Sequence, residues 1–402
     1  MRMHTLLPLV AVAIPLVASC SSSSTSSTAA NATAPSCKTD ADCAASANAP
    51  LCDAASHACI PLPPGHEIGY RDGSSASVMF TEIYKASASA KLVDLDFDPD
   101  HEGWLWAVGY GDDSTHLGQG IGTDAPTWKR YVDPAAMHFM HKPPALAMGG
   151  GQRWATCGDN DNSQNDPSGD GSANLFMGPA MFETDLAVFA KRTPEGRGSH
   201  TDMLHNTPFC RGIAHETKLV YWVFNSYDKS IDKYDFGKEH EPGGDDHSAG
   251  SIYRYVGGQV KGKDGVSSHV AFDSTDGFLY IADTGNQRIA RLDTTKGMKG
   301  GALPRQMEPL KDDAVMKDTT LEEIVPSGTL DGPSGIEVRG DLIYVTDATT
   351  STFHVFDKKG TEVRSLATDL PGGALSGFVF GPDGKIYFTD KSTSRVVRID
   401  PQ

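Results

Sequence analysis

Residues 269–293 read HVAFDSTDGFLYIADTGNQRIARLD, and this stretch decides the fold of the chain. Apolar, β-branched and aromatic residues dominate 269–273, 278–283 and 287–292, while Ser, Thr, Asp, Asn and Gly separate these runs. Short runs of this kind between turn residues are typical of strands joined by hairpins. The stretch therefore predicts three antiparallel strands in one small sheet.

The same pattern recurs along the chain. Residues 332–357 and 375–400 repeat it with Asp347 and Asp390 at the position of Asp283, and residues 211–235 repeat it with Asn225 there. Fainter copies occupy 92–109 and 145–157. Strand-only copies at intervals of about 40 to 70 residues are typical of a β-propeller. The sequence thus predicts an all-β, six-bladed propeller over residues 75–402.

The segment LYIADTGNQRI at 279–289 resembles the consensus of the NHL-repeat β-propellers. The resemblance implies a ring of blades whose loops on one face surround a central channel, where propeller binding sites usually lie. One such frame hosts many activities, so the resemblance implies an architecture more firmly than a function.

The two ends of the propeller are expected to meet. Residues 77–86 (SVMFTEIYKA) have a strand-like pattern, and the last copy ends after only its third strand. We expect this N-terminal strand to become the outer strand of the last blade, because pairing the first and last segments removes two open edges.

The N-terminus indicates export. Arg2 precedes an apolar run that is too short to span a membrane, so residues 1–19 are expected to be a signal peptide. The sequence VASC at 17–20 resembles the bacterial lipobox, which implies lipidation of Cys20 and, with Ser21 behind it, an outer-membrane location in a Gram-negative cell. The alternative is an ordinary signal peptide with a chance Cys. Residues 20–36, rich in Ser and Thr, are expected to form a tether.

Residues 37–60 contain four cysteines, Cys37, Cys43, Cys52 and Cys59. Four closely spaced cysteines in an exported protein predict a small disulfide module, and three pairings are possible. The spacing resembles short Cys-rich modules of myxobacterial surface lipoproteins. A zinc site is the alternative, although the gaps are wider than the usual C-x₂-C pairs. The Pro-rich residues 61–74 are expected to be a linker.

Two further cysteines are expected to bond to each other. In the propeller assignment, Cys157 ends the second strand of blade 2 and Cys210 precedes the inner strand of blade 3. These positions lie on the same face of neighbouring blades, so a Cys157–Cys210 disulfide is predicted. The alternative is two separate buried thiols.

The charge of the chain restricts its partners. The formal net charge is −17 at pH 7, which makes nucleic acids and anionic membrane surfaces poor partners. Contact with the membrane is expected only through the lipid anchor, and the ring is expected to be a monomer that binds a small ligand or a protein.

Several residues near the expected channel are candidates for a binding site. Histidines concentrate in blades 3 and 4, and His205 and His269 both lie next to inner strands, so they are candidate ligands of a divalent metal such as zinc. His247 lies in a link expected on the opposite face, unless its Gly-rich insertion folds back. The candidate ligand-binding set is His205, Arg211, Asn225, His269 and Asp283. Structural roles are the alternative, because histidines often only hold loops and a recurrent Asp before a turn can fix a hairpin.

A metal-dependent lyase or hydrolase is the alternative to a binding protein. It would use His205 and His269 as metal ligands, Arg211 to stabilise an oxyanion and Tyr227 as an acid or base. In the related amidating lyases, histidines that enter the inner strands of several blades bind zinc; here only His269 lies near such a position, while Ser334 and Ser376 occupy the equivalent places. The regucalcin and gluconolactonase propellers imply a Glu, Asn and Asp set, of which Asn225 and Asp283 match two members.

The insertion GDNDNSQNDPSGDGS at 158–172 partly matches a calcium-binding loop. The oxygen-bearing positions of the pattern fall on Asp159, Asp161, Ser163, Asn165 and Asp170. Gln164 replaces the usual Gly and Asp170 replaces the bidentate Glu, so the match is partial and a solvated loop is the alternative. The possible cofactors are thus zinc or calcium.

Overall fold

The computed structural model describes residues 36–46, 48–161 and 175–402, which divide into two units, Met1–Leu62 and Pro63–Gln402. The signal peptide, Cys20 and most of the tether lie outside the described residues. In the described part of the chain, no helix has the length and apolar character needed to cross a membrane.

The small N-terminal unit is held by two disulfides. It contains the 3₁₀ helix η1 (Asp40–Cys43) and an antiparallel pair of strands, β1 (Leu51–Asp53) and β2 (Ala58–Ile60). Cys37 bonds to Cys52 and Cys43 bonds to Cys59. The disulfide module is therefore present, with one of the three pairings that the spacing left open, and such bonds are typical of an oxidising compartment.

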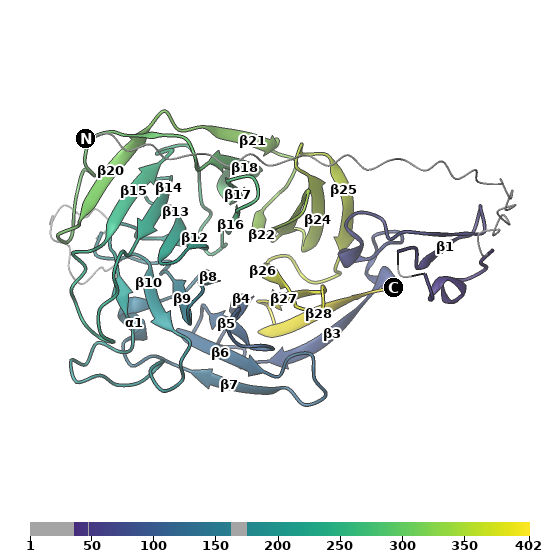
Figure 1. The fold of residues 1–402 in the computed structure, drawn as a ribbon, viewed down its shortest axis with the longest axis horizontal. Coiled ribbons are helices and arrows are strands. Elements are labelled where there is room, and N and C mark those ends of the chain that lie inside the picture. Colours follow the sequence, from purple (N-terminus) through teal and green to yellow (C-terminus); the bar gives the residue numbers. More distant parts are fainter. Residues whose placement is uncertain (1–35, 47, 162–174) are drawn as a thin grey trace, which may run out of the picture. The chain divides into compact units, whose positions relative to one another are not determined.

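The large unit is a six-bladed β-propeller, with the inner strands of the blades around the centre of the ring (Figure 1). Blade 1 comprises β4 (Leu92–Phe97), β5 (Leu105–Gly109), β6 (Ser114–Gln119) and β7 (Thr127–Tyr131). Blade 2 comprises β8 (Leu146–Met148), β9 (Arg153–Thr156), β10 (Ala180–Glu183) and β11 (Asp202–Met203). Blade 3 comprises β12 (Cys210–Thr217), β13 (Val220–Asn225), β14 (Ser230–Asp235) and β15 (Ser251–Tyr255). The short helix α1 (Ala136–Phe139) lies in the link between blades 1 and 2.

Blades 4 to 6 follow the same plan. Blade 4 comprises β16 (Val270–Asp273), β17 (Phe278–Asp283), β18 (Arg288–Asp293) and β21 (Leu321–Val325), with η4 (Thr284–Asn286) between β17 and β18. Blade 5 comprises β22 (Pro333–Arg339), β23 (Leu342–Asp347), β24 (Thr352–Asp357) and β25 (Glu362–Ala367). Blade 6 comprises β26 (Leu375–Phe380), β27 (Ile386–Asp390), β28 (Arg395–Pro401) and β3 (Val78–Lys85). The three strands expected in residues 269–293 are thus β16, β17 and β18.

The core lies between blades, which explains why the middle strands are almost continuously apolar. In β17, five consecutive residues from Leu279 to Asp283 are buried, because each face of the strand packs against a neighbouring sheet. Tyr280 packs with Ile343 and Val345 of blade 5. Each fully buried aliphatic side chain of this kind stabilises the fold by about 1.5–3 kcal/mol.

The recurrent Asp residues fix hairpins and blade links. Asp283 accepts hydrogen bonds from the Lys261 backbone N–H at 2.7 Å and from Arg288 Nε at 2.8 Å. Asp347 and Asp390 likewise accept backbone N–H groups of the turns that follow them. All three are at most 1% exposed, so their recurrence has a structural cause.

The N-terminal strand closes the ring as expected. β3 pairs antiparallel with β28, from Lys85 opposite Arg395 to Val78 opposite Pro401. Part of the segment expected to be a stiff linker packs against the propeller. The 3₁₀ helices η2 (His66–Ile68) and η3 (Ser75–Ser77) lie in this segment, Ile68 is buried in the core of blades 5 and 6, and Tyr344 donates a hydrogen bond to Glu67 at 2.6 Å.

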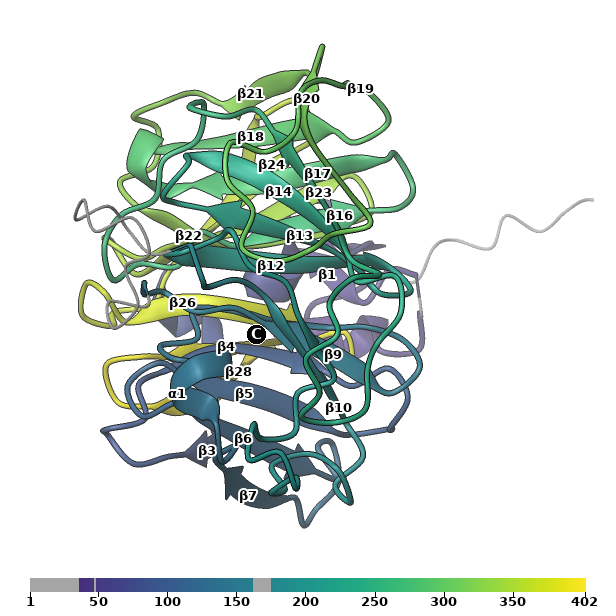
Figure 2. The same cartoon turned by 90° about the vertical axis from the view of Figure 1, so that its left-hand side faces the viewer.

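Blade 3 carries two additional strands from a later part of the chain. The insertion between β18 and β21 forms β19 (Met298–Lys299) and β20 (Asp312–Lys317), and β20 pairs parallel with β15. Figure 2 shows β19 and β20 side by side. The repeat pattern did not predict that β20 pairs with blade 3, because the sequence of the insertion does not match the blade repeat.

Candidate functional site

The central channel contains an acidic cavity of about 230 Å³ lined by inner strands of blades 1 to 5. Asp94 and Asp96 on β4 point toward blade 2, where they accept the backbone N–H groups of Leu146 at 2.8 Å and Met148 at 2.9 Å. Burial raises the pKa of Asp96 to about 7 and also raises the pKa of Asp94. These carboxylates therefore join blade 1 to blade 2.

His269 lines this acidic cavity. Its Nδ1 lies 3.6 Å from Asp94 Oδ1, and burial lowers the pKa of its imidazole to about 4, so the ring is neutral at pH 7. Nε2 of His269 is buried without a hydrogen-bond partner among the described residues. The expected position near the channel is therefore correct for this residue.

A network of serine hydrogen bonds connects several blades. Ser267, in the link between blades 3 and 4, donates from Oγ to the Pro144 carbonyl at 2.8 Å, and its own carbonyl accepts from Ser334 Oγ at 3.0 Å. Ser376 Oγ donates to Ser267 Oγ at 3.5 Å. These contacts connect blades 2, 5 and 6 through one link, so the residues at the positions of the amidating-lyase histidines here bridge the ring.

A second cavity, of about 440 Å³, lies on the face formed by the blade links and the hairpins between second and third strands. We call it the mouth pocket, and its lining residues are Tyr110, Asp159, Phe209, Arg211, Ser226, Tyr227, Asp264 and Gly265. Lys391 of blade 6 donates to the Gly265 carbonyl at 2.7 Å and lies 5.0 Å from the centre of the Tyr110 ring of blade 1. The Lys391–Gly265 contact joins blade 6 to the link between blades 3 and 4 across the ring, which places the pocket over the channel.

Ion pairs hold the floor of the mouth pocket. Arg211, only 3% exposed, donates to Asp159 and, from Nη2, to Asp264 Oδ1 at 3.0 Å. Tyr110 Oη donates to Asp159 Oδ2 at 2.8 Å. Burial is the largest influence on Asp159 and raises the pKa of its carboxyl to about 6, while Arg211 opposes that rise. Arg211 and Tyr227 thus line one pocket, as the prediction of a site containing both residues requires.

The Cys157–Cys210 disulfide supports this floor, since Cys210 is next to Arg211 and Cys157 is close to Asp159. The backbone N–H of Cys210 also donates to the Gly158 carbonyl at 3.0 Å. The disulfide expected from the blade assignment is present and joins blade 2 to blade 3.

Asn225 and Asp283 line none of the three cavities described here. Asn225 is fully buried, and its side chain donates to Asp232 at 2.8 Å and accepts the Asp228 backbone N–H at 3.0 Å. The partners of Asp283 are backbone and side-chain donors of its own blade and the preceding link. Both were candidates because they lie at matching repeat positions, and those positions are buried supports of hairpins.

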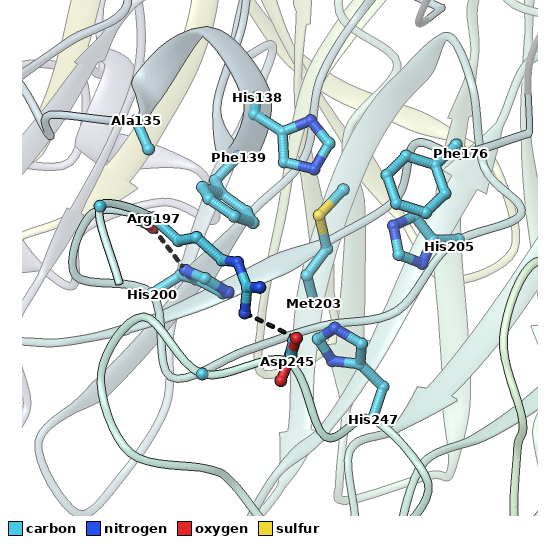
Figure 3. Close-up of a pocket in the computed structure, with 12 residues that line it drawn as sticks. Ala135, His138, Phe139, Phe176, Arg197, His200, Met203, His205, Asp245 and His247 are labelled. Atoms are coloured by element: carbon cyan, nitrogen blue, oxygen red, sulfur yellow. Dashed lines mark hydrogen bonds and ion pairs between the residues drawn. The ribbon is translucent and has the colours of Figure 1, made fainter. Parts of the chain in front are cut away.

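A third cavity, also of about 440 Å³, lies at the outer part of blade 2 beside α1, and we call it the rim cavity. Figure 3 shows His138, His200, His205 and His247 around this space, together with Met203 and two phenylalanines. The rings of His205 and His247 are 5.9 Å apart between centroids, and His240 lies 5.4 Å from His247. Burial lowers the pKa of His200 to about 3 and lowers that of His205 strongly, so both rings are neutral at pH 7.

The structure does not bring His205 and His269 together. His205 lines the rim cavity and His269 lines the channel cavity. The prediction that both bind one metal ion is therefore wrong. His205 instead lies with His247, because the Gly-rich insertion folds back along residues 200 and 201. The backbone N–H of His240 donates to the Thr201 carbonyl at 3.0 Å, and that of Gly243 donates to the His200 carbonyl at 2.8 Å.

The sequence signal for this fold-back was the Gly243-Gly244 pair. Gly243 has a φ of 78°, and a Cβ there would lie 2.4 Å from Thr193 Oγ1, so only glycine fits the turn. Asp202 and His138 carried no such signal in the sequence, because their proximity to the cluster depends on the packing of blade 2 and its preceding link.

The calcium-loop pattern lies only partly within the described residues. Ser163, Asn165 and Asp170 lie outside the described residues. Asp159 is engaged by Arg211 and Tyr110 at the mouth pocket, so its carboxylate already has a role there.

Comparisons with known proteins identify the fold. No family model matches the chain, and no curated protein matches it. Among solved structures, the chain is similar to an auxiliary nutrient binding protein from Bacteroides ovatus, with a TM-score of 0.51 and 14% identity over 81% of this chain and 72% of that one.

Two further solved structures are similar to the chain. An auxiliary nutrient binding protein from Bacteroides thetaiotaomicron has a TM-score of 0.51 and 12% identity over 80% of this chain and 76% of that one. A calcium-binding regucalcin from Agrobacterium tumefaciens has a TM-score of 0.49 and 11% identity over 81% of this chain and 96% of that one. At these identities the likeness is one of fold alone, and the fold is a six-bladed β-propeller.

Proposed function

We propose that the protein is an exported, lipid-anchored propeller that binds a small polar ligand in the mouth pocket. The observation that carries this proposal is the buried Arg211, held between two carboxylates at the base of a 440 Å³ concavity on the loop-rich face. A pocket of this volume falls in the usual range for small-molecule sites, which is about 300–1,000 Å³.

The lining of the pocket favours a neutral ligand rich in hydroxyl groups, such as a sugar or a cyclic polyol. Two cations, Arg211 and Lys391, face two carboxylates, Asp159 and Asp264, so the pocket offers hydrogen-bond donors and acceptors with little net charge. Phe209 and Tyr227 add aromatic surface beside these polar groups. Aromatic surface packs well against an apolar face of a ligand, and polar groups fix its orientation.

The enzyme alternative has less support. A lyase or hydrolase of the kind considered above needs His205 and His269 in one metal site beside Arg211 and Tyr227. The two histidines line different cavities, and the other two residues line a third.

A ligand screen tests the proposal. Sugars and polyols, with carboxylates and phosphates for comparison, are added to the purified protein while its melting temperature is followed, and hits are measured by calorimetry. A bound ligand raises the melting temperature because it stabilises only the folded state. We expect a neutral polyol to bind and Tyr227→Ala to weaken binding more than 10-fold.

Met298→Ala is the matched control, since Met298 is also an exposed apolar side chain but lies on β19. It should leave ligand affinity unchanged. Binding only of anions contradicts the ligand class, and equal affinity of the Tyr227→Ala variant and the parent contradicts the pocket.

The lipid anchor is a separate part of the proposal, supported by the VASC sequence at 17–20 and by the disulfides. We expect Cys20→Ala to move the protein from the membrane fraction to the soluble fraction, because the thiol that carries the lipid is absent. Cell fractionation with an antibody against the propeller measures this, and an unchanged membrane fraction contradicts lipidation at Cys20.

A further inference from the structure

Four histidines in or beside the rim cavity, His200, His205, His240 and His247, share one feature: a hydrogen bond holds Nδ1 of each ring. His200 Nδ1 contacts the Arg197 carbonyl at 3.0 Å, and His240 Nδ1 contacts the Glu241 carbonyl at 2.7 Å. His205 Nδ1 contacts the Glu308 carboxylate, and His247 Nδ1 contacts Asp202 Oδ1 at 2.8 Å. A carbonyl or carboxylate acceptor requires a proton on Nδ1, so Nε2 is the atom of His200, His205 and His240 that can offer a lone pair. His247 differs, because its Nδ1 faces Asp202 and a metal ion there would take the place of the proton between the two side chains. Such anchoring by carbonyls and carboxylates is typical of histidines that bind metals.

Three atoms of this group are buried without a hydrogen-bond partner among the described residues. They are Nε2 of His205, Nε2 of His240 and Oδ2 of Asp202. Asp202 is fully buried, and only its other oxygen is engaged, by His247 and by the Met203 backbone N–H. A buried acceptor without a partner costs about 1–3 kcal/mol, so a cation that satisfies several of them at once recovers that cost.

Asp202, His240 and His247 already lie at nearly the spacing a metal needs. Each offers one ligand atom, and the three atoms lie within 4.8 Å of one another. Ligands of a tetrahedral zinc ion with bonds of about 2.0–2.1 Å are about 3.3 Å apart, so small side-chain rotations bring the atoms into place. His240 and His247 come from the folded-back insertion and Asp202 from β11, so two segments supply the set.

We propose that Asp202, His240 and His247 bind one divalent transition-metal ion of the zinc class at the outer part of blade 2. Two imidazoles and one carboxylate suit zinc and its neighbours rather than calcium, which prefers oxygen ligands alone. His205, anchored by Glu308 of the β19–β20 insertion, supplies a further donor beside them.

The position of this site separates it from the mouth pocket. His247 lines the rim cavity of about 440 Å³, which Phe139, Phe176 and Met203 also line. Three protein ligands leave coordination positions for solvent or for a bound molecule, and the rim cavity provides the space beside them.

Metal titration tests the proposal with a readout independent of catalysis. The purified full-length protein is stripped with a chelator and titrated with Co²⁺, whose visible absorption reports its coordination; Zn²⁺ is then added in competition against a chromophoric chelator. We expect one equivalent of metal per chain, and a higher melting temperature with Zn²⁺ because the ion binds only the folded state. His240→Gln and Asp202→Asn should each weaken Zn²⁺ binding about 100-fold or more.

His101→Gln is the matched control, because His101 also pairs with a carboxylate, at 2.9 Å from Asp98, but lies in blade 1. It should bind Zn²⁺ like the parent. His240 is partly exposed, so its replacement should leave the metal-free melting temperature and the near-UV circular dichroism unchanged. Absence of stoichiometric binding, or loss of binding in a His269→Gln variant while His240→Gln retains it, overturns the proposal.

Discussion

Single carboxylates in the channel are the clearest source of pH dependence. Asp96 has its pKa raised by burial to about 7, against 3.8 for the free side chain. Between these values the folded state holds a proton that the unfolded state has released. The free energy of unfolding therefore falls as the pH rises from about 4 to 7 and stays low above that range.

Asp96→Asn should remove much of this fall. Asparagine cannot ionise, but its side-chain oxygen can still accept the Met148 N–H. Relative to the parent, we expect the variant to be more stable at pH 8 than at pH 5 by at most about 2.6 kcal/mol, because only the two pH units between 5 and 7 contribute. Denaturant unfolding at the two pH values measures the gain.

Asp124→Asn, at an exposed position, serves as the comparison. It should leave the free energy of unfolding unchanged at both pH 5 and pH 8. If the Asp96→Asn variant shows the same stability difference between pH 5 and pH 8 as the parent, the carboxyl does not titrate in the expected range.

At the same scale, residue patterns predicted some sites and missed others. The structural role of Asp283, Asp347 and Asp390 could be predicted from the sequence, because each residue lies directly before a turn that its carboxylate stabilises. Asp202 was missed because its neighbours, His240 and His247, come from an insertion more than 35 residues later in the chain. A contact of that range depends on packing that no local pattern describes.

Among the elements, β3 has the largest expected effect on stability. It forms the whole outer edge of blade 6 and separates its partner β28 from solvent. We expect a chain that begins near Ala88 to lose cooperative unfolding or to aggregate, because it exposes an unpaired edge. Thermal unfolding followed by circular dichroism measures this change.

A chain that begins at Pro63 is the matched control, because it keeps η2, η3 and the entire propeller unit. It should melt like the parent. A chain beginning near Ala88 that melts at the parent temperature contradicts the role of β3 in closing the ring.

Element boundaries followed from the sequence wherever a strand repeated. β16, β17 and β18 match the expected runs to within a residue or so, since hairpin turns delimit them. The segment 61–74 did not follow its composition. Its prolines predicted a stiff linker, yet Ile68 and Glu67 pack on blades 5 and 6. A single buried Ile within a polar segment is a weak signal.

At the scale of the whole molecule, the number of blades and the closure were predictable because a ring repeats its pattern. The placement of the three cavities was not. The mouth pocket depends on links from blades 2, 3 and 4 converging with Tyr110 and Lys391, and the rim cavity depends on an insertion folding back. Repeats predict the frame, whereas the segments that depart from the repeat build the candidate sites.

The return of β20 to blade 3 has a consequence for the order in which the molecule can assemble during synthesis. Blade 3 lacks its fifth strand until residue 317 has been made, after three strands of blade 4 are already present. Blade 6 waits even longer, because the earliest propeller strand, β3, pairs with the last, β28. The nascent chain therefore cannot complete its ring blade by blade and stays open until its end emerges, a state compatible with threading through an export channel.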